Sequence, residues 1–191
     1  MHLDRRAFLR MGGGALITAI GSSLAIPALA QVASPALVGI KDTGCRTLAL
    51  QALNTGEKLK VDYWVDGDYV QDALSGIDRV LRDHRSGEVH RIEPKLLDQL
   101  NDLQSRLELS SGFQVISGYR SPATNAKLHE KSSGVASKSL HMLGHAIDIR
   151  VPGCALDRLH QTALAMKAGG VGYYPKSNFV HVDIGRVRHW A

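Results

Sequence analysis

Two short stretches near the C-terminal end decide how this chain is organised: Ser139-Leu140-His141-Met142-Leu143-Gly144-His145-Ala146-Ile147-Asp148 and Asn178-Phe179-Val180-His181-Val182-Asp183. Residues 146–150 and 179–184 alternate between apolar and polar side chains, which is typical of β-strands with one buried face. Asp148 then faces away from its apolar neighbours, and His181 shares a strand face with Asp183. Two neighbouring strands and a loop can therefore bring two imidazoles and a carboxylate to one point.

We predict that His141, Asp148 and His181 are three ligands of one catalytic zinc ion per chain. Imidazole nitrogen and carboxylate oxygen suit Zn²⁺, and a hydrolytic zinc site needs three protein ligands with a fourth position left for water. A zinc ion lowers the pKa of such a water toward about 7 and polarises a scissile carbonyl. The predicted chemistry is therefore hydrolysis.

The two stretches also resemble a known family of zinc peptidases. They contain the pattern Ser-x-His-x-x-Gly-x-Ala-x-Asp followed by a later His. This pattern is shared by the group (LAS) that includes D-Ala-D-Ala carboxypeptidases and dipeptidases, L-alanoyl-D-glutamate phage endolysins and the hedgehog zinc-site domain. Within this group the chain is similar to the murein endopeptidase K-like enzymes, which Gram-negative bacteria export through the twin-arginine (Tat) pathway. The likeness extends to residues 116–121, 168–175 and 188–190, and so covers nearly the whole chain.

This resemblance implies a periplasmic zinc endopeptidase whose partner is peptidoglycan. The bond cleaved would be a stem-peptide crosslink, from meso-diaminopimelate to D-Ala or between two diaminopimelate residues. A stem-peptide D,D- or L,D-carboxypeptidase is an alternative of the same chemical class. A non-catalytic, zinc-stabilised cell-wall-binding module is an alternative from another class, which the hedgehog-like relatives illustrate.

Hydrolysis also needs a group that takes a proton from water and returns it to the leaving amine. Asp183 is the nearest candidate for this catalytic role; alternatively, it orients His181 without contacting the metal. The sequence departs here from the broader family, in which a glutamate or a histidine acts as the base. Asn178 and Phe179 occupy those two positions and cannot do so. His189 is a second candidate for the base.

Arg120 is the predicted clamp for an oxyanion or a substrate carboxylate. A planar guanidinium binds a carboxylate through two hydrogen bonds and stabilises developing negative charge. The resemblance supports this catalytic and substrate-binding role, and the alternative is a surface arginine paired with an acid. Tyr119 and Ser139 are predicted to line the substrate site.

The first thirty residues predict a twin-arginine signal peptide. Asp4-Arg5-Arg6-Ala7-Phe8-Leu9-Arg10 precedes a mostly apolar run, and Ala28-Leu29-Ala30 offers a cleavage site. The run is short and broken by glycines, so we do not expect a stable membrane anchor. The predicted organisation is a signal over residues 1–30, a tether over residues 31–45 and a single zinc-peptidase domain over residues 46–191, located in the periplasm.

Composition narrows the class of partner. The whole chain has a net charge of +5, and removal of the predicted signal, with three arginines and one aspartate, leaves +3. This mild basicity suits a polyanionic surface such as a cell wall. The chain has no basic run interleaved with aromatic residues, so we do not expect nucleic-acid binding.

Cys45 and Cys154 are the only cysteines. Twin-arginine export carries folded proteins, which favours two free thiols over a Cys45–Cys154 disulfide formed in a reducing cytosol.

The remaining pattern indicates an α+β fold. We expect a hairpin over residues 46–53 and 57–65, a buried strand over residues 113–117, and a final hairpin over residues 171–174 and 179–184. Helices are expected over residues 70–84, 93–109 and 156–167, the last ended by Gly169-Gly170, with another opened by Ser121-Pro122. The prediction is a small, mostly antiparallel sheet with helices packed on it and the zinc site on the sheet face.

Overall fold

The computed structural model describes residues 44–132 and 134–191. The predicted signal peptide and nearly all of the predicted tether lie outside these residues. Within the described part, every helix is too short or too polar to cross a membrane.

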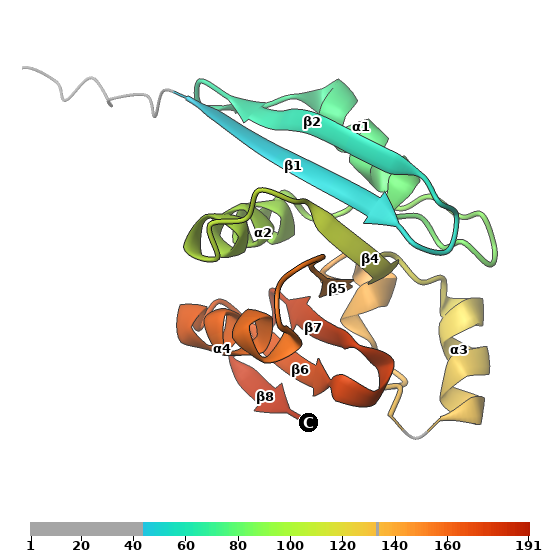
Figure 1. The fold of residues 1–191 in the computed structure, drawn as a ribbon. Helices are drawn as coiled ribbons and strands as arrows, with labels where there is room; N and C mark the ends of the chain where they lie inside the picture. Colours follow the sequence, from blue (N-terminus) through green and yellow to red (C-terminus); the bar gives the residue numbers. More distant parts are fainter. Residues whose placement is uncertain (1–43, 133) are drawn as a thin grey trace, which may run out of the picture. The chain divides into compact units, whose positions relative to one another are not determined.

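A single mixed sheet organises the described part (Figure 1). Its strands are β1 (Cys45–Ala52), β2 (Lys58–Val65), β3 (Asp68–Tyr69), β4 (Phe113–Ser117), β5 (Ala146–Arg150), β6 (Gly170–Tyr174), β7 (Phe179–Asp183) and β8 (Arg188–Trp190). They lie in the order β3-β2-β1-β4-β5-β7-β6-β8. Both predicted hairpins are present, as β1–β2 and β6–β7.

The sheet is mixed, which corrects the prediction of a mostly antiparallel one. β1 pairs with β4 in parallel, and β6 pairs with β8 in parallel. Hairpin patterns reveal only strands that follow each other along the chain. The partner of β1 comes after two helices, and β8 has only three residues, so neither parallel pair leaves a periodic signal in the sequence.

The helices are α1 (Gln71–Val80), α2 (Pro94–Arg106), α3 (Pro122–Lys131) and α4 (Leu156–Met166), with short 3₁₀ turns η1 (Leu140–Leu143) and η2 (Pro175–Ser177). α3 begins as predicted, because the Ser121 hydroxyl accepts a hydrogen bond from the Thr124 N–H at 3.2 Å. α4 is capped after Met166 by Lys167, which adopts a left-handed conformation with φ of 51°. Gly169-Gly170 therefore do not end this helix as expected, and Gly170 instead begins β6.

The core lies on the face of the sheet that α1, α2 and α4 cover (Figure 1). The leucine stripe of α2 is buried there as predicted, and so are alternate residues of β5 and β7. Asp148 pairs with His181 in the β5–β7 ladder, so both side chains leave the sheet on the opposite face. The two predicted strands therefore present their polar residues on one side, away from α1, α2 and α4.

Candidate metal centre

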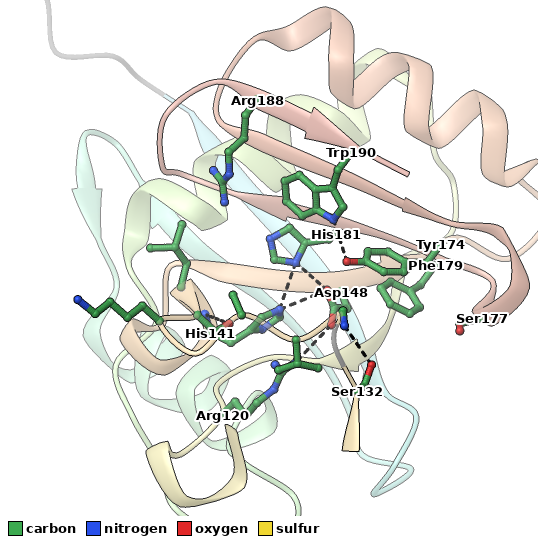
Figure 2. A pocket seen from close by; sticks show the side chains of 16 residues that line it. Arg120, Ser132, His141, Asp148, Tyr174, Ser177, Phe179, His181, Arg188 and Trp190 are labelled. Carbon is green, nitrogen blue, oxygen red and sulfur yellow. Dashed lines mark hydrogen bonds and ion pairs between the residues drawn. The ribbon is translucent and has the colours of Figure 1, made fainter. Parts of the chain in front are cut away.

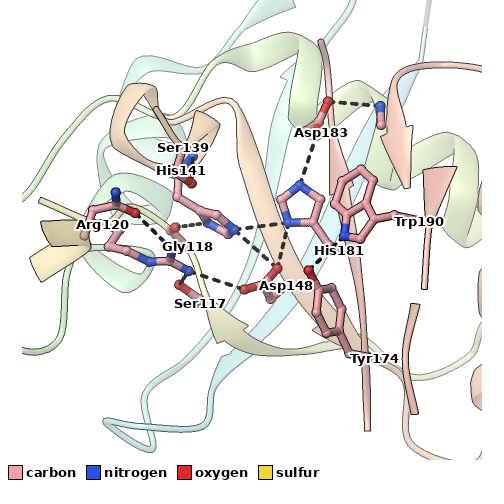
Figure 3. A network of polar contacts seen from close by, with 12 residues as sticks. Ser117, Gly118, Arg120, Ser139, His141, Asp148, Tyr174, His181, Asp183 and Trp190 are labelled. Atoms are coloured by element: carbon pink, nitrogen blue, oxygen red, sulfur yellow. Dashed lines mark hydrogen bonds and ion pairs between the residues drawn. The ribbon is translucent and has the colours of Figure 1, made fainter. Parts of the chain in front are cut away.

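His141, Asp148 and His181 converge on one point (Figure 3). Asp148 Oδ1 lies 3.3 Å from His141 Nε2 and 2.9 Å from His181 Nδ1, and the two ring nitrogens are 3.2 Å apart. Bonds of about 2.0–2.1 Å in tetrahedral geometry place ligand atoms about 3.3 Å from one another. The donor types and their spacing therefore fit a single small metal ion.

The three groups are withdrawn from solvent, with exposed fractions of 2% for His141, 6% for Asp148 and 9% for His181. Burial would raise the pKa of Asp148, but the charges and hydrogen bonds of the two histidines hold it well below its usual value. Burial would lower the pKa of His181, but hydrogen bonds to Asp148 and Asp183 raise it to about 9. The three groups thus form a desolvated cluster in which Asp148 is held as a carboxylate by the two histidines.

The loop that carries His141 is fixed at both of its ends. The Ser139 hydroxyl accepts a hydrogen bond from the His141 N–H at 3.4 Å at the start of η1. Gly144 ends η1 with a positive φ of 68°, and a side chain there would overlap the Arg91 carbonyl. The Ser and Gly of the sequence pattern therefore shape the loop that carries the candidate ligand His141.

The outer nitrogen of each histidine ring is held by a hydrogen bond. His141 Nδ1–H donates to the Gly118 carbonyl at 2.7 Å, and His181 Nε2–H donates to Asp183 Oδ2 at 3.1 Å. Each bond orients its ring and turns the other nitrogen toward the shared point. Both rings are therefore oriented for metal ligation.

Asp183 is fully buried, with an exposed fraction of 0%. Its carboxylate accepts hydrogen bonds from His181, from the Arg188 guanidinium, and from the backbone N–H groups of Gly170 and Gly185. A general base must come within hydrogen-bond reach of the water it deprotonates. This placement favours the second predicted role, in which Asp183 orients His181.

Arg120 is brought beside Asp148 by an irregularity in β4. Val115 pairs with Ile149, whereas Ser117 pairs with Asp148, so the extra residue turns the end of the strand toward the site. Arg120 Nη2 lies 3.7 Å from Asp148 Oδ2, and the residue is 9% exposed. Among the described residues, its Nε has no hydrogen-bond partner. Arg120 is therefore a buried cation facing the site and not a surface arginine.

These groups open into a cleft of about 490 Å³ (Figure 2). Arg120, Ser139 and His141 line it together with an aromatic wall formed by Tyr174, Phe179 and Trp190. In this wall Tyr174 stacks on Phe179 at 4.5 Å, and Trp190 Nε1–H donates to the Tyr174 hydroxyl at 2.8 Å. The cleft thus joins the candidate metal point to a charged and an aromatic surface.

Two predicted residues lie elsewhere. Tyr119 stacks on His90 at 4.6 Å and is absent from the cleft lining described above. His189 is exposed on β8 between Arg188 and Trp190, which both line the cleft, so strand alternation directs it to the other face.

Sequence reasoning missed three residues that build the site. Arg188 and Trp190 belong to the terminal segment that carries the family resemblance, and that segment was the only signal for them. Asp83 is buried and accepts the Ser121 N–H at 2.9 Å, immediately after Arg120. Nothing in its local sequence pattern indicates this contact.

Comparison with known proteins gives the family of this chain. Residues 41–190 match the model of the family described as peptidoglycan L,D-endopeptidase MepK. The chain is 43% identical over 187 residues to the peptidoglycan L,D-endopeptidase MepK of Escherichia coli, covering 98% of this chain and 97% of that protein. It is 38% identical over 189 residues to the probable peptidoglycan L,D-endopeptidase MepK of Haemophilus influenzae, covering 98% of this chain and 95% of that protein. The chain belongs to the peptidoglycan L,D-endopeptidase MepK family.

Proposed function

We propose that this protein is a zinc-dependent peptidoglycan endopeptidase that hydrolyses stem-peptide crosslinks in the periplasm. The observation that carries the proposal is the group of three donor atoms, within 3.3 Å of one another, in residues that line a cleft together with Arg120. Two imidazoles and one carboxylate are a common ligand set of hydrolytic zinc sites. The substrate class is supported by relatives that are named peptidoglycan L,D-endopeptidases.

Each residue of the candidate site has a separate role in the proposed hydrolysis. His141, Asp148 and His181 hold the zinc ion, which when bound supplies Lewis-acid polarisation of the scissile carbonyl and of water. Asp183 keeps the His181 ring in place through the bond to Nε2. The Arg120 guanidinium, pre-positioned by Ser117 and Asn125, stabilises negative charge on the substrate.

The test is digestion of purified muropeptides by the exported protein, with and without a chelator. We expect crosslinked dimers to become monomers, the chelator to stop this reaction, and added zinc to restore it. Removal of a terminal residue from uncrosslinked peptides, with dimers left intact, would instead identify a carboxypeptidase. A zinc-loaded protein that binds sacculi but releases nothing from them would be a wall-binding module.

Export is a separate part of the proposal. Residues 1–30 direct the chain through the twin-arginine pathway, residues 31–45 form a tether, and residues 46–191 form the single peptidase domain. The support is the sequence pattern alone, because residues 1–43 lie outside the described part. We expect the mature protein to begin at Gln31 in the periplasmic fraction. Replacement of Arg5 and Arg6 by lysine should leave the uncleaved precursor in the cytoplasm.

A further inference from the structure

The terminal strand β8 reaches the candidate metal centre across two glycines of β6. In the parallel β6–β8 ladder, Gly170 pairs with Arg188 and Gly172 pairs with Trp190. A side chain at Gly170 would overlap the Arg188 guanidinium and the Asp183 carboxylate, and one at Gly172 would overlap the Trp190 indole. The bare backbone of β6 therefore lets both side chains of β8 cross it and contact β7.

Arg188 makes two hydrogen bonds to Asp183. Its Nη1 lies 3.1 Å from Oδ1 and its Nη2 lies 2.7 Å from Oδ2. Asp183 is fully buried, whereas the Arg188 side chain is 32% exposed toward the cleft. The same Oδ2 accepts the His181 Nε2–H, a contact that Figure 3 shows. An unbroken chain of contacts therefore runs from Arg188 through Asp183 to a candidate metal ligand.

Trp190 contacts the same histidine from another side. The two ring centroids lie 5.2 Å apart, with the planes inclined by 50°. The Trp190 indole is held in turn by its hydrogen bond to the Tyr174 hydroxyl. The His181 ring is therefore fixed at one edge by Asp183 and packed against the indole, which restricts its rotation.

We propose that β8 is a positioning element for the metal centre, in which Arg188, acting through Asp183, and Trp190, by direct packing, aim His181 Nδ1 at the metal. Arg188 neutralises the buried Asp183 carboxylate and fixes both of its oxygens. Without Arg188, Asp183 is free to rotate away from His181 Nε2. This inference rests on the zinc site of the proposed function.

Zinc affinity measured by competition with a chelating dye tests the proposal in the full exported protein. We expect Arg188→Ala to weaken zinc binding about 10–100-fold, the range typical of residues that orient metal ligands. Arg188→Lys should recover part of this loss, because it restores the charge but not the two-point contact. Arg186→Ala removes an exposed arginine two residues earlier and is the matched control, with wild-type affinity.

Turnover of a crosslinked muropeptide gives an independent readout. The rate of Arg188→Ala should fall at limiting zinc and rise toward the wild-type rate as zinc is added. In an Asp183→Asn background, Arg188→Ala should weaken zinc binding by little more, because the two residues act in series. Zinc affinities of Arg188→Ala and Arg186→Ala that agree within about twofold would overturn the inference.

The outcomes also separate this inference from the proposed function. If the wild-type protein binds no zinc, the proposed function is wrong and β8 has no metal ion to position. Wild-type protein that binds zinc, alongside an Arg188→Ala variant that binds it equally well, overturns only the role of β8. Should Arg188→Ala not fold, Arg188→Lys and Trp190→Phe provide the same comparison with smaller perturbations.

Discussion

The two faces of β5 and β7 are buried to a similar degree but bury opposite kinds of side chain. On the helix-covered face, Ile147 and Val180 are both 0% exposed. On the other face, Asp148 is 6% and His181 is 9% exposed. Burial of apolar side chains stabilises the fold, whereas burial of charged groups gains little stability even when they are paired. The apolar face of β5 and β7 therefore contributes to the stability of the fold, and the polar face carries the candidate metal ligands.

The largest effect is expected on activity, from the polar face. Asp148→Asn removes the only carboxylate among the candidate ligands, and loss of several kcal/mol of transition-state stabilisation corresponds to about a 10³-fold lower rate of muropeptide hydrolysis. Zinc content by metal analysis should fall in parallel. Asp157→Asn, at an exposed carboxylate of α4, is the control. If Asp148→Asn turned over muropeptides at the wild-type rate, the polar face of β5 and β7 would not carry the activity.

The neighbouring residue should show the opposite behaviour. Ile147→Ala creates a cavity in the core and should lower the free energy of unfolding by about 2–5 kcal/mol, measured by urea denaturation. Turnover and zinc content of the folded fraction should stay close to those of the wild type. A loss of bound zinc without a loss of stability would show that the two faces of β5 are not independent.

Arg120→Lys separates substrate binding from metal binding on the polar face. A lysine keeps the positive charge but loses the planar, two-point geometry, so turnover should fall about 10²-fold. Zinc content should not change, because Arg120 is not a ligand. Arg85→Lys, at an exposed position, is the matched control. An equal loss of zinc in Arg120→Lys would mean that this residue builds the metal centre rather than binding substrate.

Local patterns in the sequence predicted much of this architecture. The predicted buried strand over residues 113–117 and the alternation at residues 146–150 match the bounds of β4 and β5, and the leucine stripe of α2 is buried. Strands that are long enough to show a period, and helices with a cap, carry their own signal. The candidate ligands came from such strands and from the family pattern, and the structure brings these three residues together.

Contacts between distant segments could not be predicted in this way. β8 has three residues, so Arg188 and Trp190 show no periodicity, and their place over Gly170 and Gly172 depends on a parallel pairing. Tyr119 follows a strand near the site, yet its side chain turns to stack on His90. The role of Asp183 depends on burial by its surroundings, which the alternation of β7 does not reveal.

Asp83 is a buried carboxylate that holds the chain immediately after Arg120. Its carboxylate accepts the N–H groups of Ser121 and Arg85, both at 2.9 Å. Burial would raise the pKa of Asp83, but hydrogen bonds from Thr124, Ser121 and Arg85 hold it well below its usual value. Asp83→Asn should therefore lower the free energy of unfolding by about 1–3 kcal/mol at pH 7.

The pH dependence of this difference checks its cause. A carboxylate with a lowered pKa in the folded state contributes stability above its unfolded pKa of about 3.9, and this contribution is lost as the pH falls further. The stability difference between wild type and Asp83→Asn, measured in urea, should therefore shrink below about pH 4. A difference that is constant from pH 7 to pH 3 would point to packing rather than charge.

The smallest effect on the free energy of unfolding is expected from changes to the two cysteines. This experiment tests whether the fold is stable without a disulfide. In the described part Cys45 and Cys154 are free thiols, at the start of β1 and after β5. A disulfide closing a loop of roughly 100 residues would contribute about 4.7 kcal/mol. We expect no such contribution: reductant and Cys45→Ser should each change the free energy of unfolding by less than about 0.5 kcal/mol. A larger loss in both, with unalkylated cysteines by mass spectrometry, would mean that a crosslink supplements the core.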